Sequence, residues 1–403
     1  MKPALRRALL LVFLLLSVAG CGGNDEYYGA TTPTNVPLAS SPPMGWNSWN
    51  HFACNINETL FRETADAMVE SGMRDAGYRY VNVDDCWQHE RDTNGTLQAN
   101  PQRFPSGIKA LADYVHARGL KLGLYATPGS HTCANNAGSY PGSLGSIGHE
   151  EQDARTFAAW GVDYLKYDWC GADKDGLEEI PAYTKMSEAL RATGRPIVYS
   201  LCEYGQGKPW LWGRSAGANL WRTTSDIMDS WFSVRLILLV QAPITRYAAP
   251  GSWNDPDMLE VGNGGMSDNE YRVHFGMWAL LNAPLLAGTD VRSMTAATKA
   301  ILLNQEVIAV DQDWGGQAGF KLRDDGDAEV WEKPMSDGSV VAALLNQGEQ
   351  PTNISVTASA LGLHSAAAYN ARDLWEHVDR EFADMVQATV PPHAVVMYRI
   401  GRK

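Results

Sequence analysis

The sequence predicts an α/β fold: a (β/α)8 TIM barrel followed by a small C-terminal antiparallel β-sandwich domain. From residue 43 to about 310, candidate strands and helices alternate, and eight strands over about 270 residues is the size of such a barrel. After about residue 318 the apolar spacing changes to period two, and turn signals such as Asp324-Asp325-Gly326 separate the segments. A doubly wound open sheet also explains the alternation. However, no G-x-G-x-x-G follows the first strand, which weakens the dinucleotide-binding form of that fold.

The predicted strands follow helices whose apolar residues repeat at helical spacing. One such helix carries Phe61, Ala65, Met68 and Met73 on one face, and Gly77 is placed to end it. The eight predicted strands are Met44–Trp46, Tyr78–Val83, Leu120–Ala126, Val162–Tyr167, Pro196–Leu201, Leu220–Thr223, Ile244–Ala248 and Pro284–Ala287. We therefore expect the barrel over residues 42–315 and the β domain over residues 316–403.

Composition excludes several classes of protein. The chain has 403 residues, of which 45% are hydrophobic and 20% charged, so it can bury a sizeable core and is neither disordered nor fibrous. Its net charge of −13 argues against a basic nucleic-acid groove. We therefore expect no nucleic-acid partner.

The N-terminus predicts export. Lys2, Arg6 and Arg7 precede an apolar run from Ala8 to Leu16 that is too short to span a bilayer comfortably. Small residues then lead directly to Cys21, so residues 1–20 resemble a bacterial lipoprotein signal peptide with Cys21 as the lipidated residue. An ordinary cleaved signal is the alternative. Residues 21–41 are small and polar and predict a flexible tether, which implies a periplasmic or cell-surface protein anchored to a membrane through Cys21.

Acidic residues follow the predicted strands. They are Asp84, Asp85, Asp168, Glu203, Asp226, Asp255 and Asp257. Because parallel barrel strands all end on one face, which carries the active site, these carboxylates should converge there. A single Asp at such a place is more often a helix cap, but so many strand ends in register favour a site. Tryptophans lie nearby, namely Trp49, Trp87, Trp169, Trp221 and Trp253. Two carboxylates in an aromatic-rimmed cleft suggest glycoside hydrolysis.

The cysteine count predicts disulfides rather than a metal site. Six cysteines are present, and five remain without Cys21, which fits two bridges and one free thiol in an exported protein. Four cysteines allow three pairings, and these residues alone do not select one. No C-x-x-C or H-x-x-x-H spacing is present, so we expect no bound metal.

Several long motifs, in order, resemble glycoside hydrolase family 27, the α-galactosidases or melibiases. They are Pro42-Pro43-Met44-Gly45-Trp46-Asn47-Ser48-Trp49-Asn50, Asp84-Asp85-Cys86-Trp87, Lys166-Tyr167-Asp168, Trp221-Arg222-Thr223-Thr224 with Asp226, and Trp253-Asn254-Asp255-Pro256-Asp257-Met258. The resemblance runs from about residue 42 to the C-terminus. It implies the same two-domain fold, a retaining double displacement without a cofactor, and an exo-acting enzyme that removes terminal non-reducing α-D-galactosyl residues.

The resemblance also implies a role for individual residues. Asp168 is expected to be the nucleophile and Asp226 the general acid/base, with Trp49 stacked on the galactose ring. Asp84 and Asp85 are expected to hold the 4- and 6-hydroxyls, and Lys166 and Arg222 to bind ring hydroxyls and keep Asp168 ionised. The full set of expected substrate-binding residues is Trp49, Asp84, Asp85, Lys166, Cys202, Tyr204, Arg222 and Met258.

The same resemblance selects a cysteine pairing. It implies bridges Cys54–Cys86 and Cys133–Cys170, with Cys202 free and near the sugar O2. Tyr204, in Cys202-Glu203-Tyr204-Gly205, takes a position where Trp is more usual in the galactose-selective subgroup. The segment of residues 227–252 follows the family motifs less closely.

Two alternatives remain at this stage. A β-L-arabinopyranosidase could use the same scaffold, since that sugar is galactose without C6, although paired Asp84 and Asp85 favour a sugar that retains O6. A lipoprotein that only binds sugars would need to lack one of the two acids, and both are present. The natural galactoside, the oligomeric state, and the membrane and face concerned stay open.

Overall fold

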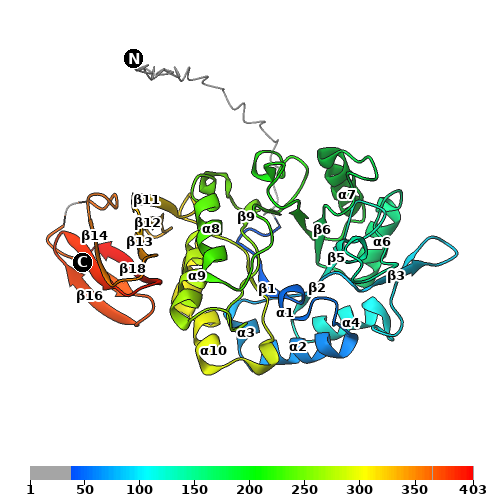
Figure 1. Ribbon diagram of the computed structural model, residues 1–403, viewed down its shortest axis with the longest axis horizontal. Coiled ribbons are helices and arrows are strands. Elements are labelled where there is room, and N and C mark those ends of the chain that lie inside the picture. Colours follow the sequence, from blue (N-terminus) through cyan, green and yellow to red (C-terminus); the bar gives the residue numbers. More distant parts are fainter. Residues whose placement is uncertain (1–37, 365, 403) are drawn as a thin grey trace, which may run out of the picture. The chain divides into compact units, whose positions relative to one another are not determined.

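The computed structural model describes residues 38–364 and 366–402 of the chain. The predicted signal peptide (1–20), Cys21 and the tether as far as residue 37 lie outside these described residues. Eight parallel strands form the first sheet, with helices outside them (Figure 1). The strands are β1 (Met44–Asn47), β2 (Tyr80–Val83), β5 (Lys121–Ala126), β6 (Tyr164–Asp168), β7 (Val198–Cys202), β8 (Leu220–Arg222), β9 (Trp253–Asp255) and β10 (Leu285–Ala287).

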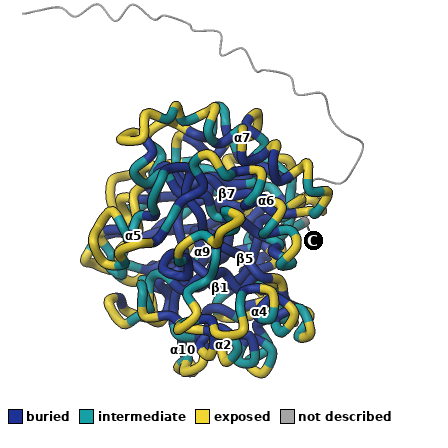
Figure 2. Tube along the Cα trace, turned by 90° about the vertical axis from the view of Figure 1, so that its right-hand side faces the viewer, coloured by how far each residue is buried: buried dark blue, intermediate teal, exposed yellow. Residues whose placement is uncertain are grey.

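The sheet curls into the predicted barrel. The strand order is β10-β1-β2-β5-β6-β7-β8-β9, and every neighbouring pair is parallel. A parallel bridge between Leu259, which follows β9, and Ala287 in β10 closes the ring. These strands lie at the buried centre of the molecule, and the exposed residues gather on the loops around them (Figure 2). The barrel predicted from the alternation of strands and helices is confirmed.

Helices connect the strands, and several begin at a side-chain cap. The α-helices are α1 (Trp49–Phe52), α2 (Glu58–Glu70), α3 (Met73–Ala76), α4 (Gly107–His116), α5 (Cys133–Asn136), α6 (Glu150–Trp160), α7 (Glu179–Ala192), α8 (Trp231–Gln241), α9 (Asp268–Leu280), α10 (Ala296–Leu302) and α11 (Gln305–Gln312). At α9, Ser267 and Glu270 form a capping box, which satisfies two backbone N–H groups at once. Short elements complete this part, namely the hairpin β3 (Gln88–Arg91) with β4 (Leu97–Ala99) and the 3-10 helices η1 (Pro209–Leu211), η2 (Thr245–Tyr247) and η3 (Val291–Ser293).

Two element predictions are wrong in detail. The strand predicted at Ile244–Ala248 is the 3-10 helix η2, and the seventh barrel strand is β9 instead. The β-branched residues Ile244 and Thr245 are typical of a strand and favoured the wrong prediction. β9, in contrast, carries the polar residues Asn254 and Asp255 and lacks an apolar run. The single helix predicted through Met73 is two helices, because Gly72 adopts a left-handed φ of 90° between α2 and α3.

The C-terminal domain is an antiparallel β-sandwich, as predicted. Its strands are β11 (Phe320–Asp325), β12 (Ala328–Pro334), β13 (Val340–Asn346), β14 (Thr352–Thr357), β15 (Tyr369–Asp373), β16 (Val378–Phe382), β17 (Met385–Val390) and β18 (Ala394–Arg402). Six strands form one sheet in the order β11-β12-β13-β18-β15-β16, and β14 pairs with β17. Apolar residues from both sheets, such as Leu344 and Val386, form a shared core between them.

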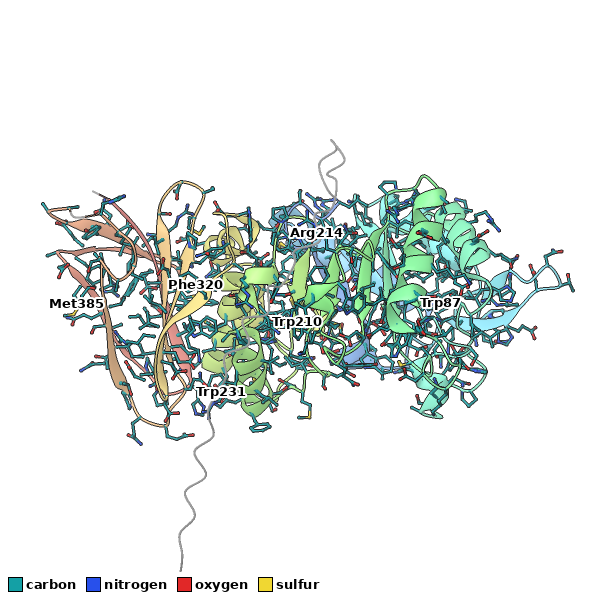
Figure 3. The ribbon with its side chains drawn as sticks, turned by 90° about the horizontal axis from the view of Figure 1, so that it is seen from above. Trp87, Trp210, Arg214, Trp231, Phe320 and Met385 are labelled. Carbon is teal, nitrogen blue, oxygen red and sulfur yellow. A yellow bond between two sulfur atoms is a disulfide. The ribbon has the colours of Figure 1, made fainter. Side chains whose placement is uncertain are left out.

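The β domain and the barrel also share apolar packing. Val341, Ala343 and Met397 of the large β sheet belong to the same buried cluster as the barrel helices. Helix α9 packs against β18 and β13 of the β domain. Trp231 at the start of α8 (labelled in Figure 3) also stacks on His393, with ring centroids 4.9 Å apart. Among the described residues, the helices are all too short or too polar to cross a membrane.

Candidate active site

A cavity of about 510 Å³ opens where the barrel strands end. Eight of the ten residues expected to bind or react with substrate line it, which are Trp49, Asp84, Asp85, Lys166, Asp168, Tyr204, Asp226 and Met258. They come from β6 and from the loops after β1, β2, β7, β8 and β9. Five of the seven acids expected to converge, Asp84, Asp85, Asp168, Asp226 and Asp257, line the cavity. Glu203 and Asp255 are buried and are not among its described lining residues.

The adjacent acids after β2 are held rigidly. Asp84 accepts hydrogen bonds from Asn47 Nδ2 at 2.8 Å and Lys166 Nζ at 2.9 Å. Asp85 accepts hydrogen bonds from the backbone N–H groups of Cys86 at 2.6 Å and Ala134 at 2.8 Å. Burial raises the pKa of Asp85 to about 6, although these N–H groups oppose the shift. Two fixed carboxylates therefore face the cavity as acceptors.

Lys166 and Asp168 project from the same strand. They are two residues apart on β6, so their side chains point to one side of the sheet. Burial opposes the positive charge of Lys166, but the neighbouring acidic groups, Asp84 foremost, together outweigh this, and the pKa of Lys166 is raised. Burial likewise raises the pKa of Asp168, and both the Lys166 ammonium and a hydrogen bond from Tyr204 act against that rise. Lys166 is thus the cation that favours ionised Asp168.

The two disulfides are those that the family resemblance implied. Cys54 is joined to Cys86, and Cys133 to Cys170, while Cys202 is free and buried. The Cys133 sulfur lies 3.3 Å from Oδ2 of Asp168. Because both sulfurs of that bridge are oxidised, their grouping with Asp168 offers no thiolate ligands for a metal.

Asp226 differs from Asp168 in its environment. Its side chain is 63% exposed, whereas Asp168 is buried. Arg222 Nη2 contacts Asp226 Oδ1 at 3.1 Å and Asp257 Oδ2 at 2.6 Å, so one buried guanidinium holds two acids. Asp257 in turn accepts a hydrogen bond from the Ile227 backbone N–H at 2.8 Å, which fixes the loop that carries Asp226.

Two expected substrate contacts are placed differently. Cys202 and Arg222 are buried, and neither is among the described residues that line the cavity. Arg222 Nη1 lies 3.7 Å from the Cys202 sulfur, behind the cavity wall. The Arg222 guanidinium pairs with Asp226 and Asp257 rather than with Asp168, because those acids follow its own strand and the next one. A direct contact of either residue with the sugar stays a prediction.

The expected tryptophan rim is mostly wrong. Trp87, Trp221 and Trp253 are fully buried and pack in the core, and of the five tryptophans considered only Trp49 is among the described lining residues. Trp87, which is labelled in Figure 3, has ring contacts with Phe157 and Trp160 of α6 instead. Strand-end position alone does not tell an inward side chain from an outward one.

Sequence reasoning missed several lining residues. They are Asn50, His51, Ala53, Tyr125, Cys133, Ile227, Met228, Asp229, Glu260 and Asn263. Glu260 accepts hydrogen bonds from Asn50 and Asn263, each at 2.5 Å, and burial raises its pKa to about 7. Asn50 lies within a quoted motif and could have been selected there. Glu260 and Asn263 follow β9 and carry no comparable sequence signal.

The arrangement defines a class of enzyme. The cavity holds a buried carboxylate beside a lysine and a second carboxylate that faces solvent. It also has fixed acceptors and an aromatic wall. Such an arrangement is typical of a glycoside hydrolase. The family described as Alpha galactosidase A matches residues 41–313, and the Alpha galactosidase C-terminal beta sandwich domain matches residues 325–400. The chain belongs to the α-galactosidase, or melibiase, family.

Relatives and solved structures agree with this placement. The chain is 53% identical to Alpha-galactosidase 2 of Arabidopsis thaliana over 92% of this chain and 91% of that protein. It resembles the α-galactosidase of Saccharomyces cerevisiae solved with raffinose, with TM-score 0.84, 31% identity and coverage of 93% and 100% of the two chains. It also resembles a GH27 β-L-arabinopyranosidase from Geobacillus stearothermophilus, with TM-score 0.81, 26% identity and coverage of 90% and 97%.

Proposed function

We propose that this protein removes terminal non-reducing α-D-galactosyl residues by a retaining double displacement, with Asp168 as nucleophile and Asp226 as general acid/base. The observation that carries this proposal is the contrast between two acids in one cavity. Asp168 is buried beside Lys166, which favours the anion that attacks, whereas Asp226 is exposed at the mouth, where a leaving group or water can reach it.

Sugar selectivity rests on the fixed acceptors. Asp84 and Asp85 line the cavity, and their remaining acceptor capacity suits adjacent sugar hydroxyls such as O4 and O6 of galactose. A sugar that lacks one of these hydroxyls loses a hydrogen bond to a buried carboxylate, which weakens its binding. Trp49 supplies the apolar wall for the ring.

The hypothesis of a β-L-arabinopyranosidase has weaker support than that of an α-galactosidase. The chain is 53% identical to the Arabidopsis α-galactosidase and 26% identical to the Geobacillus arabinopyranosidase. Without O6, the arabinopyranosyl ring would also lose a hydrogen bond to the buried Asp85. A protein that only binds sugars would need to lack one of the two acids, whereas Asp168 and Asp226 both line the cavity.

The first test is hydrolysis of p-nitrophenyl α-D-galactopyranoside by protein lacking residues 1–21, with the product anomer followed by NMR. We expect α-galactose to appear first. Asp168→Asn should abolish turnover without altering the fold, and Asp379→Asn, a surface change in the β domain, should leave turnover unchanged. Normal activity in Asp168→Asn would contradict the assignment of the nucleophile.

We further propose that the protein is exported and held on a membrane as a lipoprotein. The proposal rests on the basic start, the apolar run and the small residues before Cys21. It divides the chain into signal peptide 1–20, tether 21–41, catalytic domain 42–315 and β domain 316–403. Metabolic labelling with a fatty acid should mark the unaltered protein and not Cys21→Ser, and labelling that survives this change would contradict lipidation at Cys21.

A further inference from the structure

The loop after β7 carries Tyr204 over the cavity. Tyr204 has a left-handed φ of 64°, which non-glycine residues adopt rarely. The next residue, Gly205, packs so tightly that a Cβ there would lie 2.1 Å from the carbonyl oxygen of Thr223. The loop is therefore pressed against the segment after β8, and this contact fixes where the Tyr204 side chain points. Such strained backbone is common where a side chain must be aimed.

The Tyr204 hydroxyl is directed at the proposed nucleophile. It donates a hydrogen bond to Oδ1 of Asp168, with an oxygen–oxygen distance of 2.9 Å. It also lies 3.5 Å from each sulfur of the Cys133–Cys170 bridge. Disulfide sulfurs are weak acceptors and have no proton to donate, so the carboxylate is the strong partner of this hydroxyl.

The two oxygens of Asp168 are consequently unlike. Oδ1 accepts the Tyr204 hydrogen bond, whereas the contact of Oδ2 is the Cys133 sulfur at 3.3 Å, which supplies no proton. Among the described residues, no N–H or O–H group donates to Oδ2. A carboxylate held through one oxygen keeps the lone pairs of the other free for a new bond.

We propose that Tyr204 is a positioning residue for the retaining reaction: its hydroxyl holds Asp168 through Oδ1, presents Oδ2 for attack and favours the second displacement over the first. This inference rests on the proposed function and deepens it. The family resemblance points to Trp as the more usual residue at position 204, so this hydrogen bond depends on a residue particular to this chain.

The preference for the second step follows from the charge on Asp168. In the first displacement, Oδ2 bonds to the anomeric carbon, the glycosidic C–O bond breaks, and the leaving oxygen takes the proton of Asp226. Asp168 loses its charge, so the Tyr204 hydrogen bond weakens. In the second displacement, a water oxygen bonds to that carbon, Asp226 takes the water proton, and the electron pair of the C–Oδ2 bond returns to Asp168. The hydrogen bond then strengthens as the charge returns, which lowers this barrier.

The inference predicts distinctive kinetics for Tyr204→Phe. With p-nitrophenyl α-D-galactopyranoside, we expect kcat to fall about 10- to 100-fold, the range for a hydrogen bond to a charged group. KM should fall in parallel, because the glycosyl-enzyme accumulates, so kcat/KM on its alkaline plateau should change by less than about threefold. A burst of one equivalent of nitrophenol per active site should precede the slow steady state.

The pH profile gives a second readout. The Tyr204 hydrogen bond lowers the pKa of Asp168, so its loss should move the acid limb of kcat/KM to higher pH. The charged and titratable groups that face Asp168 are Lys166, Asp84, Asp226, Cys202, Tyr125 and Tyr183. Tyr204→Phe leaves all of them in place, so the movement of this limb reports the lost hydroxyl.

Tyr369→Phe is the matched control. It removes a phenol that donates to a backbone carbonyl at 2.8 Å in the β domain, and its kinetics should equal those of the unaltered protein. A parallel fall of kcat and kcat/KM in Tyr204→Phe, with no burst and no movement of the acid limb, would show a merely structural role and overturn the inference. Unchanged kinetics would overturn it too. Failure of the proposed function would differ, because the unaltered protein itself would then show no turnover.

Discussion

Burial changes the pKa of single residues that line the cavity, and Asp85 is the clearest example. Its pKa is raised to about 6 because the carboxylate is taken out of water, and the Ala134 and Cys86 N–H groups only partly compensate. Its folded-state pKa thus exceeds its unfolded value. Folded protein binds the extra proton between about pH 4 and 6, so this group makes the protein less stable as pH rises through that window.

The same shift predicts a pH-dependent affinity for galactose. Below about pH 6, Asp85 becomes protonated and loses part of its acceptor capacity, so galactose should bind about three- to tenfold more weakly at pH 5 than at pH 7. Calorimetric titration of Asp168→Asn protein measures this without turnover by the proposed nucleophile. Adding Asp85→Asn should weaken binding at both pH values and remove the step near pH 6. A step that persists would assign the titration to another group.

Sequence and structure differ most at the residue scale. The motifs predicted which residues meet, and Lys166 with Asp168 could be paired from their spacing alone. The Tyr204 hydrogen bond could not, because its direction depends on a left-handed backbone angle and on close packing of the neighbouring glycine. The partner of Arg222 was missed for a similar reason, since Asp257 approaches from a different strand.

At the scale of elements, apolar pattern predicts a helix or strand well when one face is buried. It failed at β9, whose residues Asn254 and Asp255 are polar yet buried. Helix α8 shows the opposite difficulty, because apolar residues lie on both its faces. Val234, Ile237 and Leu238 are buried, whereas Phe232, Leu236 and Leu239 are exposed. Apolar composition alone therefore does not orient α8.

Adjacent leucines on α8 make a matched pair for stability. Leu238 is 1% exposed and Leu239 is 64% exposed. Leu238→Ala should lower the free energy of unfolding by about 2–5 kcal/mol, because it leaves a cavity beneath the helix. Leu239→Ala should change it by less than about 0.5 kcal/mol, because helix propensity is nearly the same and little contact is lost. Urea unfolding measures both values. Equal costs would contradict the orientation of α8.

At the scale of the whole molecule, the barrel and the β domain are joined through an apolar core rather than by a tether. Gly276 on α9 faces β18, and a Cβ at that position would lie 2.7 Å from the sulfur of Met397. The same Cβ would lie 3.3 Å from the Trp375 side chain. His393, just before β18, contacts Glu270 of α9 at 2.8 Å. Glycine at position 276 therefore lets helix and sheet approach closely.

This close approach predicts strong coupling between Gly276 and Met397. Gly276→Val should cost about 1–3 kcal/mol of unfolding free energy through overpacking, and Met397→Ala about 2–5 kcal/mol through a cavity. In the double variant the valine occupies space that the methionine vacates, so the combined cost should be smaller than the sum by about 0.5–3 kcal/mol. Gly276→Val with Leu239→Ala is the matched control, because Leu239 is exposed on another helix, and these costs should add.

The outcome distinguishes two views of the β domain. If the costs of Gly276→Val and Met397→Ala simply add, α9 and β18 do not share one packed core, and the β domain should then unfold in a separate transition. If they couple as expected, both parts should unfold together, since the buried cluster containing Met397 also contains Trp278 and Leu280 of α9. Cavity residues lie outside this contact, so kcat/KM of each folded variant should match that of the unaltered protein. Stability would then be set at the interface of the two parts, and catalysis independently at the strand ends of the barrel.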